Sequence, residues 1–197
     1  MEPFEHLLEE SVALHGHMCS GQVLGVRMAL TGCRAIGLDD PKGSRELIVY
    51  VEIDRCATDA IQSVTGCKLG KRTLKYRDYG KMAATFLNTT TGQAVRVLAR
   101  DDSREQARSY ATPEASKQEA ELQAYKTMPI EALFVVTPVT LEVPEEDLPG
   151  HPVSRVMCDI CGEGINDRRE VQRDGRVLCR ACAFGTYYQE KVPASHT

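Results

Sequence analysis

Four cysteines near the end of the chain constrain its fold more than any other sequence feature. They form two CxxC pairs separated by seventeen residues, namely Cys158, Cys161, Cys179 and Cys182. Zn²⁺ binds four soft ligands in a tetrahedron, and each CxxC turn presents two thiolates to one ion. The spacing therefore predicts a structural zinc site. Four thiols without a metal, or a redox-active CxxC, are the alternatives.

The residues around these cysteines predict a treble-clef zinc finger. Gly162 permits a tight turn after the second ligand, and Asp174-Gly175 is a strong signal for a two-residue hairpin turn. The last CxxC pair then leads into a helix expected over 183–188. A knuckle, a hairpin and a helix in this order are typical of the treble clef. About 45 residues with few large apolar side chains need the metal to form a stable core.

A stretch rich in proline and acidic residues, 144–152, separates the finger from the rest of the chain. It has little apolar surface to bury, which is typical of a linker. We therefore expect two domains, an α+β core over 1–148 and the linker with the finger over 149–197. A chain of 197 residues is long enough for one domain and a small module.

Composition excludes several classes of function. No apolar run approaches the roughly 20 residues of a membrane helix, and the acidic N-terminus does not resemble a signal peptide, so a cytoplasmic protein without membrane contact is expected. In a reducing cytosol, eight cysteines indicate metal ligands or reactive thiols rather than disulfides.

Charge and aromatic content both speak against nucleic-acid binding. The formal net charge is −4, tryptophan is absent and aromatic residues make up 6% of the chain. Residues 152–197 carry seven Lys and Arg against six Asp and Glu, a weak basic footprint for phosphate contacts. We therefore expect the finger to have a structural or protein-contact role.

Helix and strand signals alternate in the core without a regular βαβ rhythm, which predicts an α+β fold. Helices are expected over 4–14, from 20 to Gly32 or Gly37, over 58–64 and over 113–128. Strands are expected over 46–54, 74–79, 81–87, 93–100 and 131–143, the last of them a core strand.

The segment His15-Gly-His17-Met-Cys19-Ser-Gly21 places two imidazoles and a thiol between two expected helices. Backbone N–H groups and the dipole at a helix N-terminus lower a thiol's pKa. Cys19 is therefore a candidate nucleophile or metal ligand. In the alternative interpretation, both histidines cap or pack and Cys19 is a small buried residue.

Two further segments carry candidate site residues. Cys56 and Asp59 follow the strand over 46–54, and the ends of buried strands commonly line clefts. Cys67 and Lys71 lie in a glycine-bearing loop that offers groups for an anion, although it is not a Walker loop. A helix cap is the alternative role for Asp59, and a solvated charge is that for Lys71. Cys33, which has no polar pattern around it, is expected to be structural.

Taken together, these segments resemble the FmdE family, named for one of the subunits of molybdenum formylmethanofuran dehydrogenase. The resemblance spans nearly the whole chain and includes the zinc module. Ser20 is a departure, since many relatives have proline there, and it leaves the His and Cys chemistry intact. The matching segments are HGHMCSG at 15–21, GVRM at 25–28, CATDA at 56–60, TGCKLGK at 65–71 and DYGK at 78–81.

The resemblance implies an α+β core with a His/Cys cleft, a treble-clef finger and a homodimer in which the finger packs on the partner subunit. It implies Zn²⁺ in the finger, and a second metal in the core held by His17, Cys19 and Cys56. The catalytic positions that it implies are His17, Cys19, Cys56, Asp59, Cys67 and Lys71, with His15 beside them.

Three functional hypotheses follow. The first is a metal-binding subunit or relative of molybdenum or tungsten formylmethanofuran dehydrogenase in one-carbon metabolism, an oxidoreductase subunit with other subunits as partners. The second is a non-catalytic accessory, assembly or metal-handling protein that dimerises through its finger. The third, a DNA-binding regulator, is the least compatible with the charge. The sequence leaves open whether the core site is catalytic.

Overall fold

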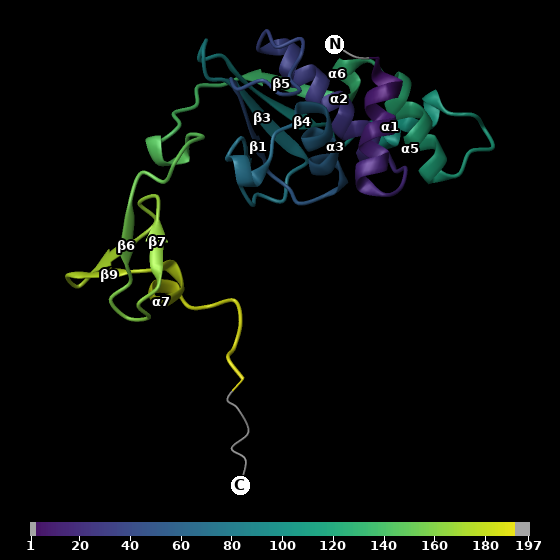
Figure 1. Cartoon of the computed structure of the whole chain (residues 1–197). Helices are drawn as coiled ribbons and strands as arrows, with labels where there is room; N and C mark the ends of the chain where they lie inside the picture. The colour runs from purple at the N-terminus through teal and green to yellow at the C-terminus, as the bar shows by residue number, and fades with distance from the viewer. Residues whose placement is uncertain (1–2, 192–197) are drawn as a thin grey trace. The chain divides into compact units, whose positions relative to one another are not determined.

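The structure is a computed structural model that describes residues 3–191 of the chain. The chain divides into two compact units, Met1–Glu142 and Val143–Thr197 (Figure 1). Each unit has a hydrophobic cluster of its own, so each buries apolar side chains within itself. Within the described residues, no helix is long and apolar enough to cross a membrane.

A five-stranded mixed sheet organises the first unit. The strand order is β2-β1-β3-β4-β5, in which β1 and β2 run parallel and the other neighbours are antiparallel. The strands are β1 Leu47–Val51, β2 Leu74–Tyr76, β3 Ala83–Asn88, β4 Ala94–Ala99 and β5 Phe134–Pro138. This arrangement confirms the expected α+β class.

Helix α2 packs on this sheet against β3 and β4, and the helices α1, α3 and α5 each pack against α2 (Figure 1). Their bounds are α1 Phe4–His15, α2 Ser20–Ala35, α3 Cys56–Thr65 and α5 Lys117–Thr127. Shorter helical turns are η1 Leu69–Lys71, α4 Ser103–Gln106, η2 Ala107–Tyr110 and α6 Ile130–Leu133. Alternation along the strands turns Val49, Phe86 and Val97 into the same core as the helices.

Glycine ends two of these helices by a shared mechanism. Gly16 follows α1 with φ 95°, and Gly66 follows α3 with φ 68°. Each donates its N–H to a carbonyl of the last turn, and the left-handed backbone has no Cβ penalty at glycine. The sequence signals therefore placed the ends of α1 and α3 to within about two residues.

Two expected elements needed correction. Helix α5 begins at Lys117 rather than at Pro113, because Ser116 and Glu119 form a capping box there. Strand β5 is shorter than the expected 131–143, and α6 precedes it. It is also an edge strand rather than a core strand, with Val135 and Val136 exposed to 42% and 39%.

The second unit follows the order expected for the finger. A short helical turn, η3 Glu145–Asp147, lies in the expected linker. Two hairpins and a helix follow, with β6 Arg155–Met157 paired to β7 Gly164–Asn166, β8 Val171–Arg173 paired to β9 Arg176–Leu178, and α7 Arg180–Phe184. The β8–β9 turn has positive φ at Asp174 (51°) and Gly175 (74°), as a tight hairpin turn requires.

The finger helix and the first hairpin differ from expectation. Helix α7 begins directly after Cys179 and ends at Gly185, whose φ is 98°, so it does not reach residue 188. The β6–β7 pair, which brackets the first CxxC turn, gave no recognisable signal because its strands are short and, unlike β8 and β9, are not joined by an Asp-Gly turn.

Candidate functional site

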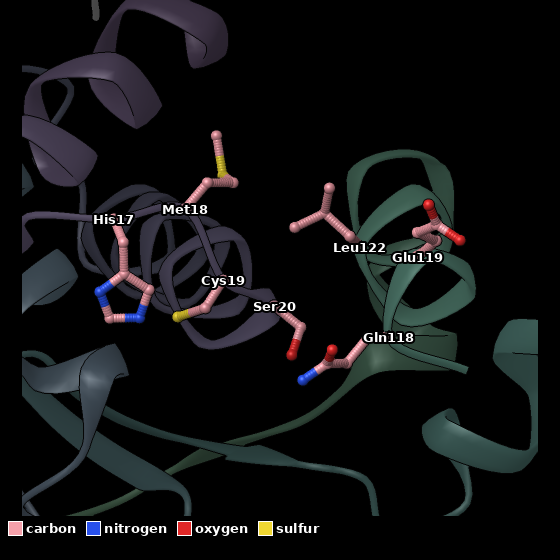
Figure 2. Close-up of a pocket in the computed structure, with 7 residues that line it drawn as sticks. All are labelled: His17, Met18, Cys19, Ser20, Gln118, Glu119 and Leu122. Atoms are coloured by element: carbon pink, nitrogen blue, oxygen red, sulfur yellow. The ribbon is translucent and has the colours of Figure 1, made fainter. Parts of the chain in front are cut away.

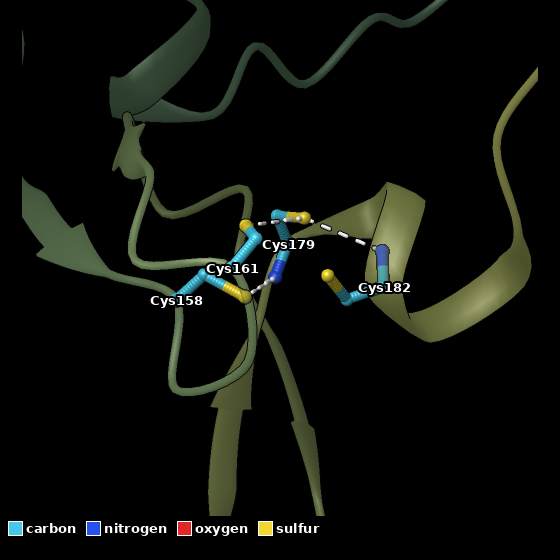
Figure 3. Close-up of side chains that lie close together, drawn as sticks. All are labelled: Cys158, Cys161, Cys179 and Cys182. Atoms are coloured by element: carbon cyan, nitrogen blue, oxygen red, sulfur yellow. Dashed lines mark hydrogen bonds between the residues drawn. The ribbon is translucent and has the colours of Figure 1, made fainter. Parts of the chain in front are cut away.

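The four cysteines of the second unit converge on one point (Figure 3). One ligand atom from each of Cys158, Cys161, Cys179 and Cys182 lies within 4.8 Å of the others. The Cys161 and Cys179 sulfurs are 3.8 Å apart. Four sulfurs at the corners of a zinc tetrahedron lie about 3.8 Å apart, given Zn–S bonds of about 2.3 Å. The cluster therefore has the composition and size of a structural zinc site.

Backbone donors prepare this cluster for a cation. The N–H of Cys179 donates to the Cys158 sulfur at 3.3 Å, and the N–H of Cys182 donates to the Cys179 sulfur at 3.3 Å. Bonds from the backbone N–H groups of Cys161 and Cys179 lower the pKa of Cys158 to about 6. These bonds favour the thiolate of Cys158, which is the form that binds metal.

A second cluster lies in the core unit, at the junction of α1 and α2. Ligand atoms of His15, His17 and Cys19 all lie within 4.8 Å of one another. His15 ends α1, and Cys19 is the residue on which α2 begins. Gly16, which turns the chain between them, lets both ends face the same point. The histidine rings are tilted, with centroids 4.6 Å apart.

Asp59 forms a hydrogen bond with the His15 ring. The Nδ1 of His15 lies 2.8 Å from a carboxylate oxygen of Asp59, which sits in the first turn of α3. A carboxylate accepts a hydrogen bond, so in the neutral ring Nδ1 carries the proton and Nε2 keeps its lone pair. That Nε2 is buried and has no hydrogen-bond partner. An unpaired buried acceptor calls for an explanation, and a cation beside it would provide one.

Cys56 lies beside Cys19, at the N-terminus of α3. A Cβ built on Gly21 would lie 3.6 Å from the Cys19 sulfur and 3.7 Å from the Cys56 sulfur. Burial, followed by a hydrogen bond with the Cys19 thiol, raises the pKa of Cys56. Two thiols thus meet where α2 and α3 begin, and the absence of a side chain at Gly21 makes room for both.

Gln22 holds the three helices in register beneath the cluster. Its side chain is fully buried, accepts a hydrogen bond from the Ser11 hydroxyl on α1, and donates to the carbonyl of Cys56 at 2.6 Å. A single amide therefore ties α1, α2 and α3 together directly under the two thiols.

Replacing Gln22 with leucine is expected to destabilise the core unit by about 1–3 kcal/mol, because a buried carbonyl and hydroxyl lose their partner. Urea unfolding followed by circular dichroism measures this loss. Gln118→Leu, an exposed glutamine on α5, is the matched control and should change the midpoint little. Equal midpoints for the two variants would contradict the bridging role of Gln22.

A pocket of about 310 Å³ opens beside Cys19 (Figure 2). Its wall on one side is the start of α2, and its wall on the other is the first part of α5 (Figure 2). The lining residues are His17, Met18, Cys19, Ser20, Gln118, Glu119 and Leu122. The Glu119 carboxylate already bonds the backbone of Ser116, so the pocket's remaining polar groups are chiefly imidazole, thiol, hydroxyl and amide.

The remaining candidates from the sequence lie elsewhere. Cys67 is 3% exposed, belongs to the hydrophobic core, and its thiol points to the carbonyl of Leu47. Lys71 is exposed on η1 and does not line this pocket. Cys33 is fully buried in the same core as Cys67, in agreement with a structural role.

Sequence reasoning missed the contributions of Gln22 and of α5. The one signal for Gln22 was a polar residue on an otherwise apolar helix face, beside Val23 and Val26. No signal pointed to Gln118 or Leu122, because only tertiary packing brings α5 against α2.

The fold and its two clusters define a class of protein: an α+β core with a His/Cys cluster, followed by a C4 zinc finger. Residues 14–135 match the family described as FmdE, Molybdenum formylmethanofuran dehydrogenase operon. Residues 152–188 match the prokaryotic dksA/traR C4-type zinc finger. The first match covers more than half of the chain, so the chain belongs to the FmdE family.

Two known proteins are similar over most of this chain. One is the crystal structure of a protein from Syntrophus aciditrophicus that is described as similar to FmdE of tungsten formylmethanofuran dehydrogenase, with TM-score 0.62, 22% identity, and coverage of 94% of this chain and 95% of that one. The other, from Archaeoglobus fulgidus, is named "Probable S-adenosyl-L-methionine-binding protein". It is 30% identical over 204 residues, covering 92% of this chain. The chain spans 53% of that relative's length.

Proposed function

We propose that the core unit binds a metal ion through His15, His17 and Cys19, with Cys56 beside it. The supporting observation is the buried, unpartnered Nε2 of His15 within a cluster of ligand atoms. Two imidazoles and one thiolate form a ligand set that suits zinc and similar transition metals. The sequence alone implied His17, Cys19 and Cys56, and the geometry adds His15 to this set.

Each residue has a defined role in this proposal. Asp59 orients the His15 ring and holds its tautomer, as carboxylates commonly do for histidine ligands. Cys19 and His17 also line the pocket, so a molecule in the pocket meets the site directly. A metal held by His15, His17 and Cys19 would supply a Lewis acid for polarising water or a substrate oxygen.

On this basis we place the protein among metal-binding relatives of the FmdE component of formylmethanofuran dehydrogenase, acting in the cytoplasm. The family match over 14–135 supports a place beside other subunits of a molybdenum or tungsten enzyme. In that setting Cys19, His17 and Cys56 are the residues that contact substrate or metal, and the finger is a structural module.

The alternative is an accessory protein that forms a homodimer through its finger. The finger exposes large apolar side chains, with Ile160 at 58%, Phe184 at 70% and Tyr187 at 100%. Exposed apolar groups of this size commonly mark protein contacts. Size measurement in solution tests this: a chain lacking residues 149–197 that remains a dimer would rule out the finger as the contact.

Metal content tests the core proposal. We expect two metal ions per full-length chain, falling to one in Cys19→Ser, because the finger keeps its own. Asp59→Asn is expected to weaken the core site about 10–100-fold, since it loosens the His15 ring. Elemental analysis and competition with a chelator measure both.

His6→Gln is the control for this experiment, because His6 is also on α1 but exposed. It should leave both metals in place. One metal per chain in the unmodified protein, retained in Cys19→Ser, would contradict a core metal site.

A further inference from the structure

We propose that Cys19 and Cys56 form a thiol–disulfide exchange site that reacts with small-molecule disulfides and closes to a disulfide joining the starts of α2 and α3. This inference goes beyond the proposed metal binding and does not require it. It rests on three features of the molecule: the juxtaposition of the two sulfurs, the pocket on one of them, and a second thiol pair that lacks both access and reactivity.

The juxtaposition is built into the fold. Both sulfurs flank the same point beside Gly21: a Cβ built there would lie 3.6 Å from the Cys19 sulfur and 3.7 Å from the Cys56 sulfur. Cys19 immediately precedes α2, and Cys56 is the first residue of α3. Because α2 and α3 pack closely at Gly25, the two helix starts stay together without any crosslink. Disulfide formation requires this kind of lasting proximity between Cβ atoms.

Access distinguishes the roles of the two thiols. Cys19 lines the pocket of about 310 Å³, whereas Cys56 is not among the lining residues. That volume is at the lower end for ligand pockets, which favours a small disulfide. Met18 and Leu122 offer apolar walls for its carbon chain, and Gln118 offers an amide. Cys19 therefore meets the incoming disulfide first, and Cys56 resolves the adduct.

The chain contains its own comparison pair. Cys33 and Cys67 lie in the same hydrophobic core, exposed to 0% and 3%. Burial, with a contribution from the charge of Cys67, raises the pKa of Cys33 to about 12, and burial also raises the pKa of Cys67. Burial keeps both thiols of this pair away from disulfides in solvent, whereas Cys19 and Cys56 are only partly buried.

The reaction balances as two successive exchanges. The Cys19 thiolate attacks one sulfur of a disulfide RSSR, the S–S bond breaks, and RS⁻ leaves with the bonding pair. The Cys56 thiolate then attacks the Cys19 sulfur of the mixed disulfide and expels the second RS⁻. The two cysteines lose two electrons and two protons, and RSSR becomes two RSH.

The test uses the reduced full-length protein, its Cys56→Ser and Cys19→Ser variants, and 2-hydroxyethyl disulfide as the probe. After acid quenching and alkylation, peptide mass mapping identifies each cysteine. We expect a Cys19–Cys56 crosslink in the unmodified protein and a stable hydroxyethyl adduct on Cys19 in Cys56→Ser. In Cys19→Ser, the probe should react with Cys56 at least tenfold more slowly than it reacts with Cys19 in Cys56→Ser. Cys33 and Cys67 should remain alkylatable only after unfolding.

Two results would overturn the proposal. One is an adduct that persists on Cys19 while Cys56 stays free in the unmodified protein. The other is modification of Cys33 and Cys67 at the same rate as Cys19. The assay requires no core metal, so a failed metal proposal leaves it intact. Conversely, metal bound at Cys19 without any exchange in the metal-free protein would sink only this inference.

Discussion

Removing the zinc ligand Cys179, as in Cys179→Ser, is expected to unfold the second unit while the core unit stays folded. The apolar cluster of the finger has four members: Cys158, Ile165, Leu178 and Ala183. Burial of an Ile or Leu side chain stabilises by only about 1.5–3 kcal/mol, whereas each ordered residue costs about 1.5 kcal/mol. Zinc binding, with an apparent free energy of about 10–16 kcal/mol, contributes more than the burial of these two side chains.

Amide hydrogen exchange on the full-length chain measures this outcome. Peptides over 155–184 should lose all protection in Cys179→Ser, and peptides from β1, β3 and β4 should keep theirs. Gln172→Ser, an exposed change on β8, is the control and should leave the finger protected. Retained protection in β8 and β9 of Cys179→Ser would show that the finger folds without its metal.

Gly25→Ala is expected to damage the proposed core site without changing any of its proposed ligands. A Cβ on Gly25 would lie 2.6 Å from the carbonyl oxygen of Ala57 and 2.6 Å from the Cβ of Ala60 on α3. Neither atom can rotate away, so α2 has to move off α3. Such overpacking costs about 1–3 kcal/mol. The same shift separates Cys19 from Cys56.

The direction of this effect is informative because alanine normally favours a helix over glycine by about 1 kcal/mol. A loss of stability therefore has to come from the contact with α3. Gly70→Ala is the matched control, since nothing lies within 4 Å of its Cβ position. Urea unfolding and core metal affinity should both fall in Gly25→Ala and remain unchanged in Gly70→Ala. Unchanged values in Gly25→Ala would show that α2 and α3 adapt.

The elements that the sequence predicted well are those with strong local signals. Helix α1 has an apolar spacing and a glycine at its end, and the β8–β9 hairpin has an Asp-Gly turn. The elements that it missed or misplaced are short, or their ends are set by side-chain hydrogen bonds that the apolar spacing does not show. The α5 start, for example, is set by a capping box whose serine follows Pro113 by three residues.

Sequence alone determined the four-cysteine cluster and the grouping of His15, His17 and Cys19. The spacing of the CxxC pairs is itself the ligand geometry, because each pair occupies one turn and one ion takes four sulfurs. Likewise, two histidines and a thiol within five residues, His15 to Cys19, must lie near one another in any fold.

Tertiary structure alone decided which distant residues complete the core site. It placed Asp59 on His15 across forty-four residues of sequence, set Cys56 beside Cys19, and added the α5 wall of the pocket. It also showed that Cys67, which was expected at the site, lies in the hydrophobic core. The reason is the packing of α2 on α3. This packing depends on Gly21 and Gly25 and on the buried amide of Gln22. Local sequence patterns do not report which helix faces will meet.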